Sequence, residues 1–170
     1  MYLAKTMSHN QQGFTLIETL IYLGLFTIIM VGVVAVAYST FEANGRLQTK
    51  TLIQEEGDFL LAKLNWALTG ATAATVVSLP SLPSLTLTRA NNPTQVVFDK
   101  NGNFLEIKRN GSPTGDNLNN SDVQITNLNF IPTGGGTSVE SITAGFSLQT
   151  KTPNGQTYSQ DFQTTKYLRK

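Results

Sequence analysis

Hydrophobic residues first gather in a long uncharged run near the N-terminus. The stretch from Thr19 to Phe41 has no charged residue, and Glu18 is the only carboxylate between residues 14 and 41. Roughly 20 apolar residues at 1.5 Å per residue cover the roughly 30 Å of a bilayer's hydrocarbon core. The pattern therefore predicts a membrane-spanning helix over residues 14–41.

A secretory signal peptide is the alternative interpretation of this run. Such a peptide has an apolar region of about 7–15 residues, a basic start and a small-residue cleavage motif. Here the run is longer, Lys5 is the sole strong base before it, and we find no such motif after Ala37. These features favour the membrane span. Charge does not orient it, because Lys5 and the amino terminus are matched by Arg46 and Lys50 on the other side.

Apolar and charged residues then mix with helical spacing up to about Thr69. Gly45 and Gly57 each cost a helix about 1 kcal/mol relative to alanine, and Gly70 is a plausible stop. The pattern predicts an amphipathic helical stalk over residues 42–70 that carries a sheet on its apolar face. The residues expected under this sheet are Phe59, Leu60, Leu64 and Trp66, with Trp66 as a core anchor.

After an Ala/Thr-rich link at residues 71–74, the pattern changes to the alternation typical of strands. Residues 85–88 alternate strictly, and residues 95–99 and 103–109 flank an Asn-Gly turn that predicts a hairpin. Residues 143–150 and 156–168 flank the turn at residues 153–155 and predict a final hairpin. Pro132 and the glycines at 134–136 predict a loop.

Residues 123–130 predict one further strand. Its inward positions are expected to be Val123, Ile125, Leu128 and Phe130, with a bulge that reconciles the last two with the first two. A long N-terminal helix, made of membrane segment and amphipathic stalk, is thus followed by an antiparallel β-sheet head. This order predicts an α+β fold in which the helix packs against the sheet.

Composition removes most catalytic chemistry. The chain has no cysteine, its one histidine is His9, and its formal net charge is +1 without a basic patch. Thiolate chemistry and metal sites, a serine–histidine triad in the head and a nucleic-acid footprint are therefore not expected. We predict no enzymatic activity, no cofactor, and no catalytic, cofactor-binding or metal-binding residue.

Two acidic clusters leave alternatives open. The segment from Asp116 to Asp122 is dense in oxygen ligands that suit calcium, but it lacks the ligand spacing of an EF-hand loop. The alternative is an ordinary turn, because Asn and Asp are also the residues that dominate turns. The carboxylates of Glu55, Glu56 and Asp58 form either a partner-docking patch or a solvated helix face.

Glu18 is the most informative residue of the apolar run. A carboxylate this close to the start of a spanning helix costs a few kcal/mol unless it reaches the interface or finds a partner. Snorkelling to the interface is the simpler interpretation, because Glu18 lies only one turn inside the segment.

The string Gly13-Phe14-Thr15-Leu16-Ile17-Glu18 favours a specific role for Glu18 over simple snorkelling. GFTLIE directly before an uncharged apolar run resembles the class III signal of type IV prepilins and pseudopilins, over about residues 13–37. The resemblance implies a pilin-like fold and cleavage by prepilin peptidase between Gly13 and Phe14, followed by N-methylation of Phe14. It also implies that Glu18 serves assembly by pairing with the amine of a neighbouring subunit.

The resemblance also implies an organisation and a location. Residues 1–13 are the prepilin leader, 14–41 the transmembrane and filament-core helix, 42–70 the stalk, and 71–170 the β-rich extracytoplasmic head. The implied partners are other pilin or pseudopilin subunits, prepilin peptidase, the inner-membrane assembly platform and membrane lipid, with no nucleic acid. The protein would be single-pass in the cytoplasmic membrane before it enters a cell-surface or periplasmic filament.

Two departures from the family pattern concern efficiency and subtype. Gln11 and Gln12 precede Gly13 where leaders often have Lys or Arg, and the membrane segment lacks the proline of many major pilins. The late strand, Gly-rich loop and final hairpin are similar to minor pilins of the W/J type, with the H type next.

Several functions remain in competition. The first is a structural minor subunit of a type IV pilus or a type II secretion-like pseudopilus, a class that includes DNA-uptake (competence) filaments. The second is a signal-anchored extracytoplasmic binding module that does not polymerise. The motif from Gly13 to Glu18 favours the first, because a simple anchor needs neither a processing site nor a carboxylate. A secreted enzyme with a removable signal is disfavoured by the lack of cysteine and of a histidine after residue 9.

Overall fold

The structure is a computed structural model that describes residue 13 and residues 15–79, 82–90, 93–134 and 139–168. The predicted leader up to residue 12 and the predicted mature terminus, Phe14, lie outside the described residues. The chain divides into two units, residues 1–42 and residues 43–170. We describe each unit by itself.

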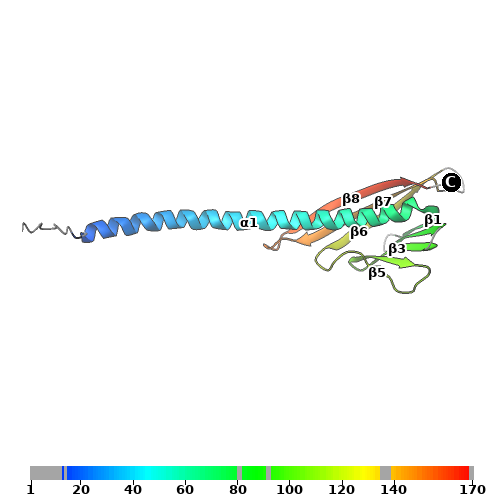
Figure 1. Ribbon diagram of the computed structural model, residues 1–170, viewed down its shortest axis with the longest axis horizontal. Coiled ribbons are helices and arrows are strands. Elements are labelled where there is room, and N and C mark those ends of the chain that lie inside the picture. The colour runs from blue at the N-terminus through cyan, green and yellow to red at the C-terminus, as the bar shows by residue number, and fades with distance from the viewer. Residues whose placement is uncertain (1–12, 14, 80–81, 91–92, 135–138, 169–170) are drawn as a thin grey trace, which may run out of the picture. The chain divides into compact units, whose positions relative to one another are not determined.

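One helix, α1 (Leu16–Thr69), contributes to both units (Figure 1). Thr15 caps its start: the Glu18 backbone N–H donates to the Thr15 side-chain oxygen at 3.4 Å and to the Thr15 carbonyl at 3.1 Å. Thr-x-x-Glu is the sequence of a capping box, which satisfies backbone N–H groups at a helix start. The helix ends directly before Gly70, as predicted, and it continues through Gly45 and Gly57.

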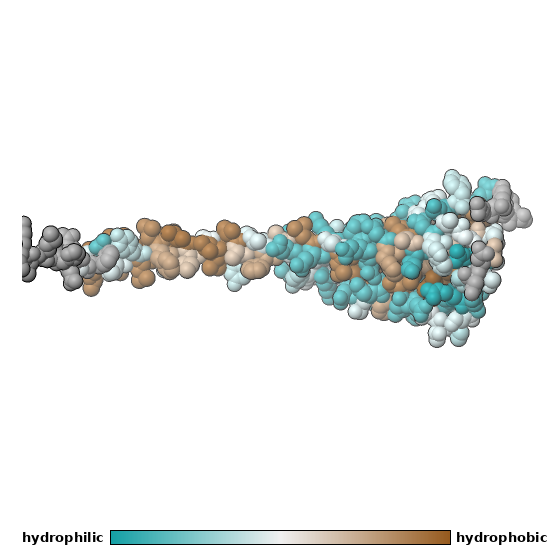
Figure 2. All heavy atoms as spheres, viewed as in Figure 1, coloured by the Kyte–Doolittle hydropathy of each residue, from teal (hydrophilic) through white to brown (hydrophobic). Residues whose placement is uncertain are grey.

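The first unit consists, in its described part, of the apolar beginning of α1. Its large hydrophobic side chains are exposed, from Met30 at 46% to Leu16 at 79%. Figure 2 shows hydrophobic residues over most of this segment. Such a surface is not stable in water on its own and has to be covered by lipid or by other protein.

The second unit combines the rest of α1 with two antiparallel sheets. The first sheet has the order β1-β2-β3-β4-β5, formed by β1 (Ala71–Leu79), β2 (Leu82–Arg89), β3 (Gln95–Asn101), β4 (Phe104–Arg109) and β5 (Asp116–Asn117). The second has the order β6-β7-β8, formed by β6 (Gln124–Thr133), β7 (Ser141–Lys151) and β8 (Thr157–Tyr167). The α+β class with an antiparallel head is confirmed.

Both predicted hairpins are confirmed. Gly102 closes the β3–β4 hairpin with φ 59°, and Gly155 closes the β7–β8 hairpin with φ 77°. Glycine adopts this left-handed conformation without the steric cost that a side chain brings. The predicted bulge in β6 is also present, at the register shift between Ile125 and Asn127.

Three expectations about the head are wrong in detail. Residues 71–74 are not a link but the start of β1, where pairing with β2 outweighs the low strand propensity of alanine. Pro132 lies in β6 opposite Ile142 rather than in a loop, which an edge strand tolerates because half of its N–H groups need no strand partner. The head also has two sheets instead of one.

The core lies where α1 meets the sheets. The buried residues of α1 recur at helical spacing of three and four, so they form one stripe; they are Thr49, Ile53, Gly57, Leu60, Leu64, Ala67 and Leu68. Leu60 and Leu64 are fully buried, as predicted, and share one core cluster with Phe98, Phe146 and Phe162. In Figure 1 the last part of α1 runs along β6, β7 and β8.

Phe59 and Trp66 do not lie in this core, contrary to the prediction. Each is 43% exposed, because both positions fall beside the buried stripe of α1 rather than on it. Each ring is instead covered by a cation: the Lys63 Nζ lies 5.3 Å from the Phe59 ring centre, and the Arg89 guanidinium lies 4.2 Å from that of Trp66. The Trp66 ring therefore stacks on the side chain of Arg89, the last residue of β2.

Candidate functional site

The candidate site is the first turn of α1 together with Gly13, which lies three residues before the helix. Gly13 is exposed and precedes the helix, and no atom of the described residues lies within 4 Å of the position that a Cβ would take. Its backbone does not need glycine for space. A requirement for glycine at residue 13 would therefore not come from a steric contact with the described part of the fold.

Glu18 projects from the first turn and is half-buried, unlike its immediate helix neighbours. The Tyr22 hydroxyl, one turn further on, donates a hydrogen bond to the Glu18 Oε1 at 3.2 Å. The structure thus brings Glu18 together with Tyr22, whereas Phe14, the predicted processing residue whose amine on a neighbouring subunit is the expected partner of Glu18, lies outside the described residues. The roles predicted for Gly13, Phe14 and Glu18 remain predictions.

Sequence reasoning missed Thr15 and Tyr22. Both carried a recognisable signal: Thr15 begins a Thr-x-x-Glu capping box, and Tyr22 stands four residues after Glu18, where helix side chains meet. The prediction for Glu18 considered solvent and a neighbouring subunit, and it overlooked a donor on the same helix.

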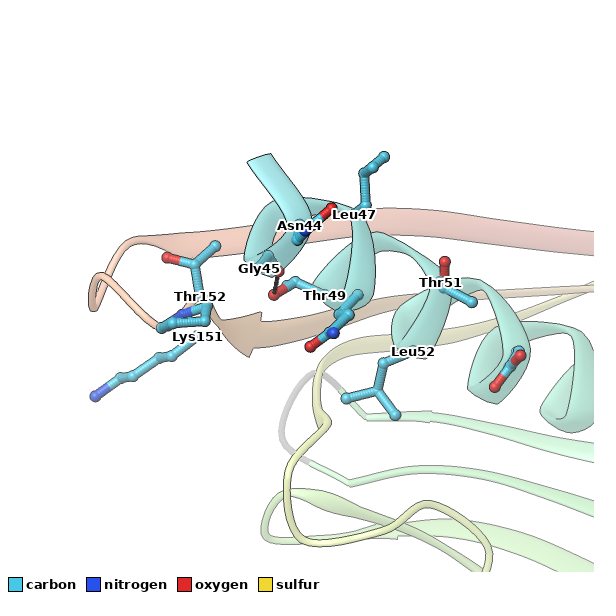
Figure 3. A pocket seen from close by; sticks show the side chains of 11 residues that line it. Asn44, Gly45, Leu47, Thr49, Thr51, Leu52, Lys151 and Thr152 are labelled. Carbon is cyan, nitrogen blue, oxygen red and sulfur yellow. Dashed lines mark hydrogen bonds between the residues drawn. The ribbon is translucent and has the colours of Figure 1, made fainter. Parts of the chain in front are cut away.

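A groove in the second unit lies between α1 and the β7–β8 turn (Figure 3). Its volume is about 720 Å³, and its lining includes Leu47, Leu52 and Pro153 as well as amide and hydroxyl side chains. Glu55 and Lys151 are its charged lining residues. These groups offer hydrogen bonds and apolar contact, but no paired nucleophile and base.

The loop considered for calcium uses its amides within the chain. The buried Asn119 accepts from the Leu105 N–H at 2.7 Å and donates to the Val123 carbonyl at 2.6 Å. Asn120 accepts from the N–H groups of Asp122 and Val123, at 2.9 and 3.0 Å. Within the described ranges, no three acidic, histidine or cysteine side chains gather as a metal site.

The helix carboxylates considered for docking are partly used in the same way. Glu56 accepts the Asn120 N–H at 2.7 Å and thereby ties α1 to this loop, and Asp58 accepts from Gln54 at 3.1 Å. Gln54 in turn accepts from Gln160 of β8 at 2.7 Å. At least part of the cluster therefore fastens the helix to the head.

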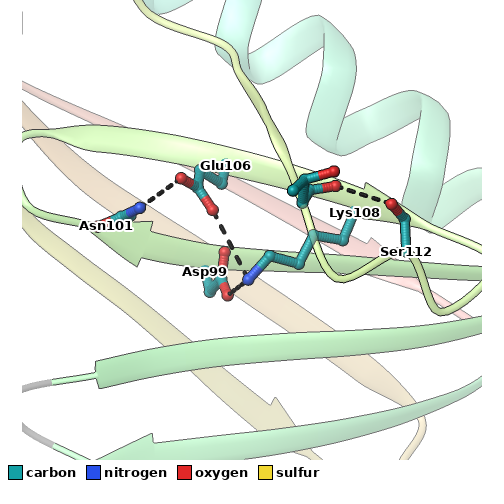
Figure 4. Close-up of polar contacts among 6 residues, drawn as sticks. Asp99, Asn101, Glu106, Lys108 and Ser112 are labelled. Carbon is teal, nitrogen blue, oxygen red and sulfur yellow. Dashed lines mark hydrogen bonds and ion pairs between the residues drawn. The ribbon is translucent and has the colours of Figure 1, made fainter.

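A charged network lies on β3 and β4 (Figure 4). Asp99 and Glu106 stand opposite each other in the strand register, and the Lys108 Nζ bridges them, 2.6 Å from Asp99 Oδ2 and 3.6 Å from Glu106 Oε2. The hydrogen bond to Asp99 is the main reason why the pKa of Lys108 is raised. The lysine relieves the repulsion of two facing carboxylates, so the network stabilises the hairpin.

Comparison with known proteins agrees with this location of the site. Residues 8–34 match the family model of the prokaryotic N-terminal methylation motif, a range that contains Gly13, Phe14, Glu18 and Tyr22. No curated protein and no solved structure matches the chain. The matched motif supports a type IV pilin-like protein that is processed by prepilin peptidase.

Membrane anchoring is supported by the motif and the helix together. Among the described residues, α1 is long and apolar enough to cross a membrane, and the apolar stretch is not buried within the chain. The helix therefore combines a processing motif with a surface that requires a hydrophobic environment.

Proposed function

We propose that this protein is a structural, non-enzymatic minor subunit of a type IV pilus or of a type II secretion-like pseudopilus. Prepilin peptidase cuts between Gly13 and Phe14 and methylates Phe14, and the mature chain assembles through α1. The observation that carries the proposal is the methylation motif at residues 8–34, continuous with a helix whose apolar side chains are uncovered. The head faces away from the cytoplasm, and the assembly platform and other pilin-like subunits are its partners.

Glu18 has a defined role in this proposal. Cleavage creates an amine at Phe14, and the Glu18 carboxylate pairs with this amine on a neighbouring subunit. Opposite charges attract far more strongly in apolar surroundings than in water, so the pair offsets the cost of the carboxylate and sets the register of subunits. The half-buried position of Glu18 on an otherwise uncharged apolar surface supports this role.

The alternative is an anchored extracytoplasmic binding module that does not polymerise. The groove along residues 44–55 and 151–153 gives such a module a surface for a ligand. This reading leaves the motif from Gly13 to Glu18 without a use, so the filament subunit is preferred.

Processing tests the proposal directly. N-terminal mass spectrometry of the protein from its native membrane should find a chain that begins at methylated Phe14. Gly13→Val should block this cleavage without disturbing the described fold, because none of the described residues lies within 4 Å of an added Cβ. Conversion of the Gly13→Val chain at the wild-type rate, or a mature terminus near Ala37, would contradict the assignment.

A further inference from the structure

The contact between Tyr22 and Glu18 has no role in the function proposed so far. The two residues are one helical turn apart, a spacing at which side chains meet on a helix surface. The Tyr22 hydroxyl donates to Glu18 Oε1 at 3.2 Å, which is longer than the roughly 2.5–3.0 Å usual for such bonds. The hydroxyl thus orients the carboxylate through one hydrogen bond and leaves its other acceptor positions accessible.

The chemistry of a carboxylate leaves room for a second donor. Its two oxygens offer about four acceptor positions, and one hydroxyl proton uses one of them. Oε1 faces Tyr22, so Oε2 can accept a cationic donor from another chain while the first bond persists. A hydrogen bond from Tyr22 also restricts the rotation of the Glu18 side chain, and this reduces the ordering that pairing must still impose.

The apolar surroundings of Glu18 increase the importance of the Tyr22 hydroxyl as a hydrogen-bond donor to its carboxylate. Leu20, Ile21 and Leu23 near Glu18 are large apolar side chains that are more than half exposed, and they offer no polar contact through their side chains. A carboxylate in such surroundings costs a few kcal/mol unless polar groups compensate it. Tyrosine provides an apolar ring that suits lipid and one hydroxyl that suits the carboxylate.

We propose that Tyr22 is a positioning residue for Glu18: its hydroxyl holds Oε1 so that the carboxylate is presented to the N-terminal amine of a neighbouring subunit. This inference rests on the proposed function and adds a second residue of this chain to the assembly site. A merely interfacial tyrosine would act independently of Glu18, and that difference can be measured.

The test compares variants of the full-length protein in cells that assemble the filament. Tyr22→Phe removes only the hydroxyl and should lower the filament-bound fraction about two- to tenfold, the size expected for one hydrogen bond. Tyr38→Phe, at the other tyrosine of the apolar segment, is the matched control and should leave the fraction unchanged. Mass spectrometry should show unaltered cleavage and methylation in both variants.

A second background separates positioning from a general structural effect. Glu18→Asp keeps the charge but shortens the side chain by one methylene, which withdraws it from the Tyr22 hydroxyl. If Tyr22 acts through Glu18, Tyr22→Phe should cause no further loss in the Glu18→Asp background. An equal loss in both backgrounds would overturn the proposal, as would a defect of Tyr22→Phe in leader cleavage.

Glu18→Val distinguishes this inference from the function on which it rests. It should leave membrane insertion intact and lower the filament-bound fraction more than Tyr22→Phe does. If Glu18→Val has its effect and Tyr22→Phe has none, the inference about Tyr22 alone is wrong. If Glu18→Val enters filaments like the wild type, the pairing role of Glu18 fails, and the positioning role of Tyr22 fails with it.

Discussion

Gly57 shows how a single residue joins the helix to the head. A Cβ at this position would overlap the ring of Phe162, which lies on β8 and stacks on Phe146 with ring centres 5.4 Å apart. From the sequence alone, Gly57 only lowers the predicted stability of the helix. Helix propensity is a local quantity and does not include a contact with an aromatic ring far along the chain. The close approach explains why the buried stripe of α1 contains a glycine.

We predict that Gly57→Ala destabilises the second unit despite its better helix propensity. The propensity gain is about 1 kcal/mol, but forcing a methyl group into a filled core typically costs about 1–3 kcal/mol and here displaces a ring. Urea unfolding of a fragment of residues 44–170 should therefore show a net loss of stability. The same substitution in a Phe162→Leu background should cost much less, and an equal cost in both backgrounds would contradict the proposed clash.

Local patterns predict residue roles only where a local rule decides them. The spacing along α1 placed Leu60 and Leu64 in the core correctly, and alternation did the same for Val123 and Phe130. Trp66 was misplaced, because its hydrophobicity suggested the core while its helical position lies beside the stripe. Arg89, distant in the sequence, supplies the stacking partner that lets Trp66 remain partly exposed.

At the scale of elements, the β3–β4 hairpin is held by its turn and by charge. Gly102 fixes the register that sets Asp99 opposite Glu106, and this pairing would be repulsive without Lys108. The turn was predictable from Asn-Gly. The network was not, because the lysine that bridges the pair is a diagonal neighbour whose side-chain direction only the folded sheet defines.

The raised pKa of Lys108 gives this hairpin a pH dependence. A folded-state pKa above the ordinary value of 10.5 means that the contribution of Lys108 is complete below that value and is lost as the pH rises through the folded-state pKa. Lys108→Met should therefore lower the stability of the fragment of residues 44–170 by about 1 kcal/mol or less at neutral pH. This difference from the wild type should shrink above pH 10.5.

Urea titrations between neutral and alkaline pH, read as differences between variant and wild type, would measure this effect. Lys151→Met, which changes an exposed lysine at the end of β7, serves as the control and should show no such trend. A difference for Lys108→Met that stays constant through the alkaline range would show that the lysine acts by packing alone.

At the scale of the whole molecule, the two units differ in the environment in which each is stable. The fragment of residues 44–170 keeps the buried stripe of α1 and should be soluble, with cooperative unfolding. A fragment of residues 70–170 keeps every strand but removes the stripe that shares one core cluster with Phe146, Leu148 and Phe162. It should aggregate or stay molten, because an uncovered apolar sheet face promotes association.

Two measurements would separate these outcomes. NMR spectra of both fragments report whether tertiary structure is unique, and size-exclusion chromatography reports association. A well-dispersed spectrum from the fragment of residues 70–170 would show that the head folds without the helix. The packing of α1 would then contribute little to the second unit.

The overall class of the fold was predictable, whereas the division of the head was not. Helical periodicity, turn glycines and strand alternation are local, and they indicated a helix followed by an antiparallel head. The two sheets are joined by contacts such as the hydrogen bond from the Ile125 N–H in β6 to the carbonyl of Asn103, the residue before β4. These contacts join segments that no local window includes.

The contact of Phe162 with Gly57 also determines which part of the core can form only late during synthesis of the chain. The helix stripe leaves the ribosome early, but the ring that closes over it follows after more than half the chain length, in β8. Pairings this distant form late, because closing a long loop costs entropy before contacts repay it. A chain that has not yet made β8 lacks this ring, so we expect the part of the stripe around Gly57 to stay accessible to proteases until β8 is complete.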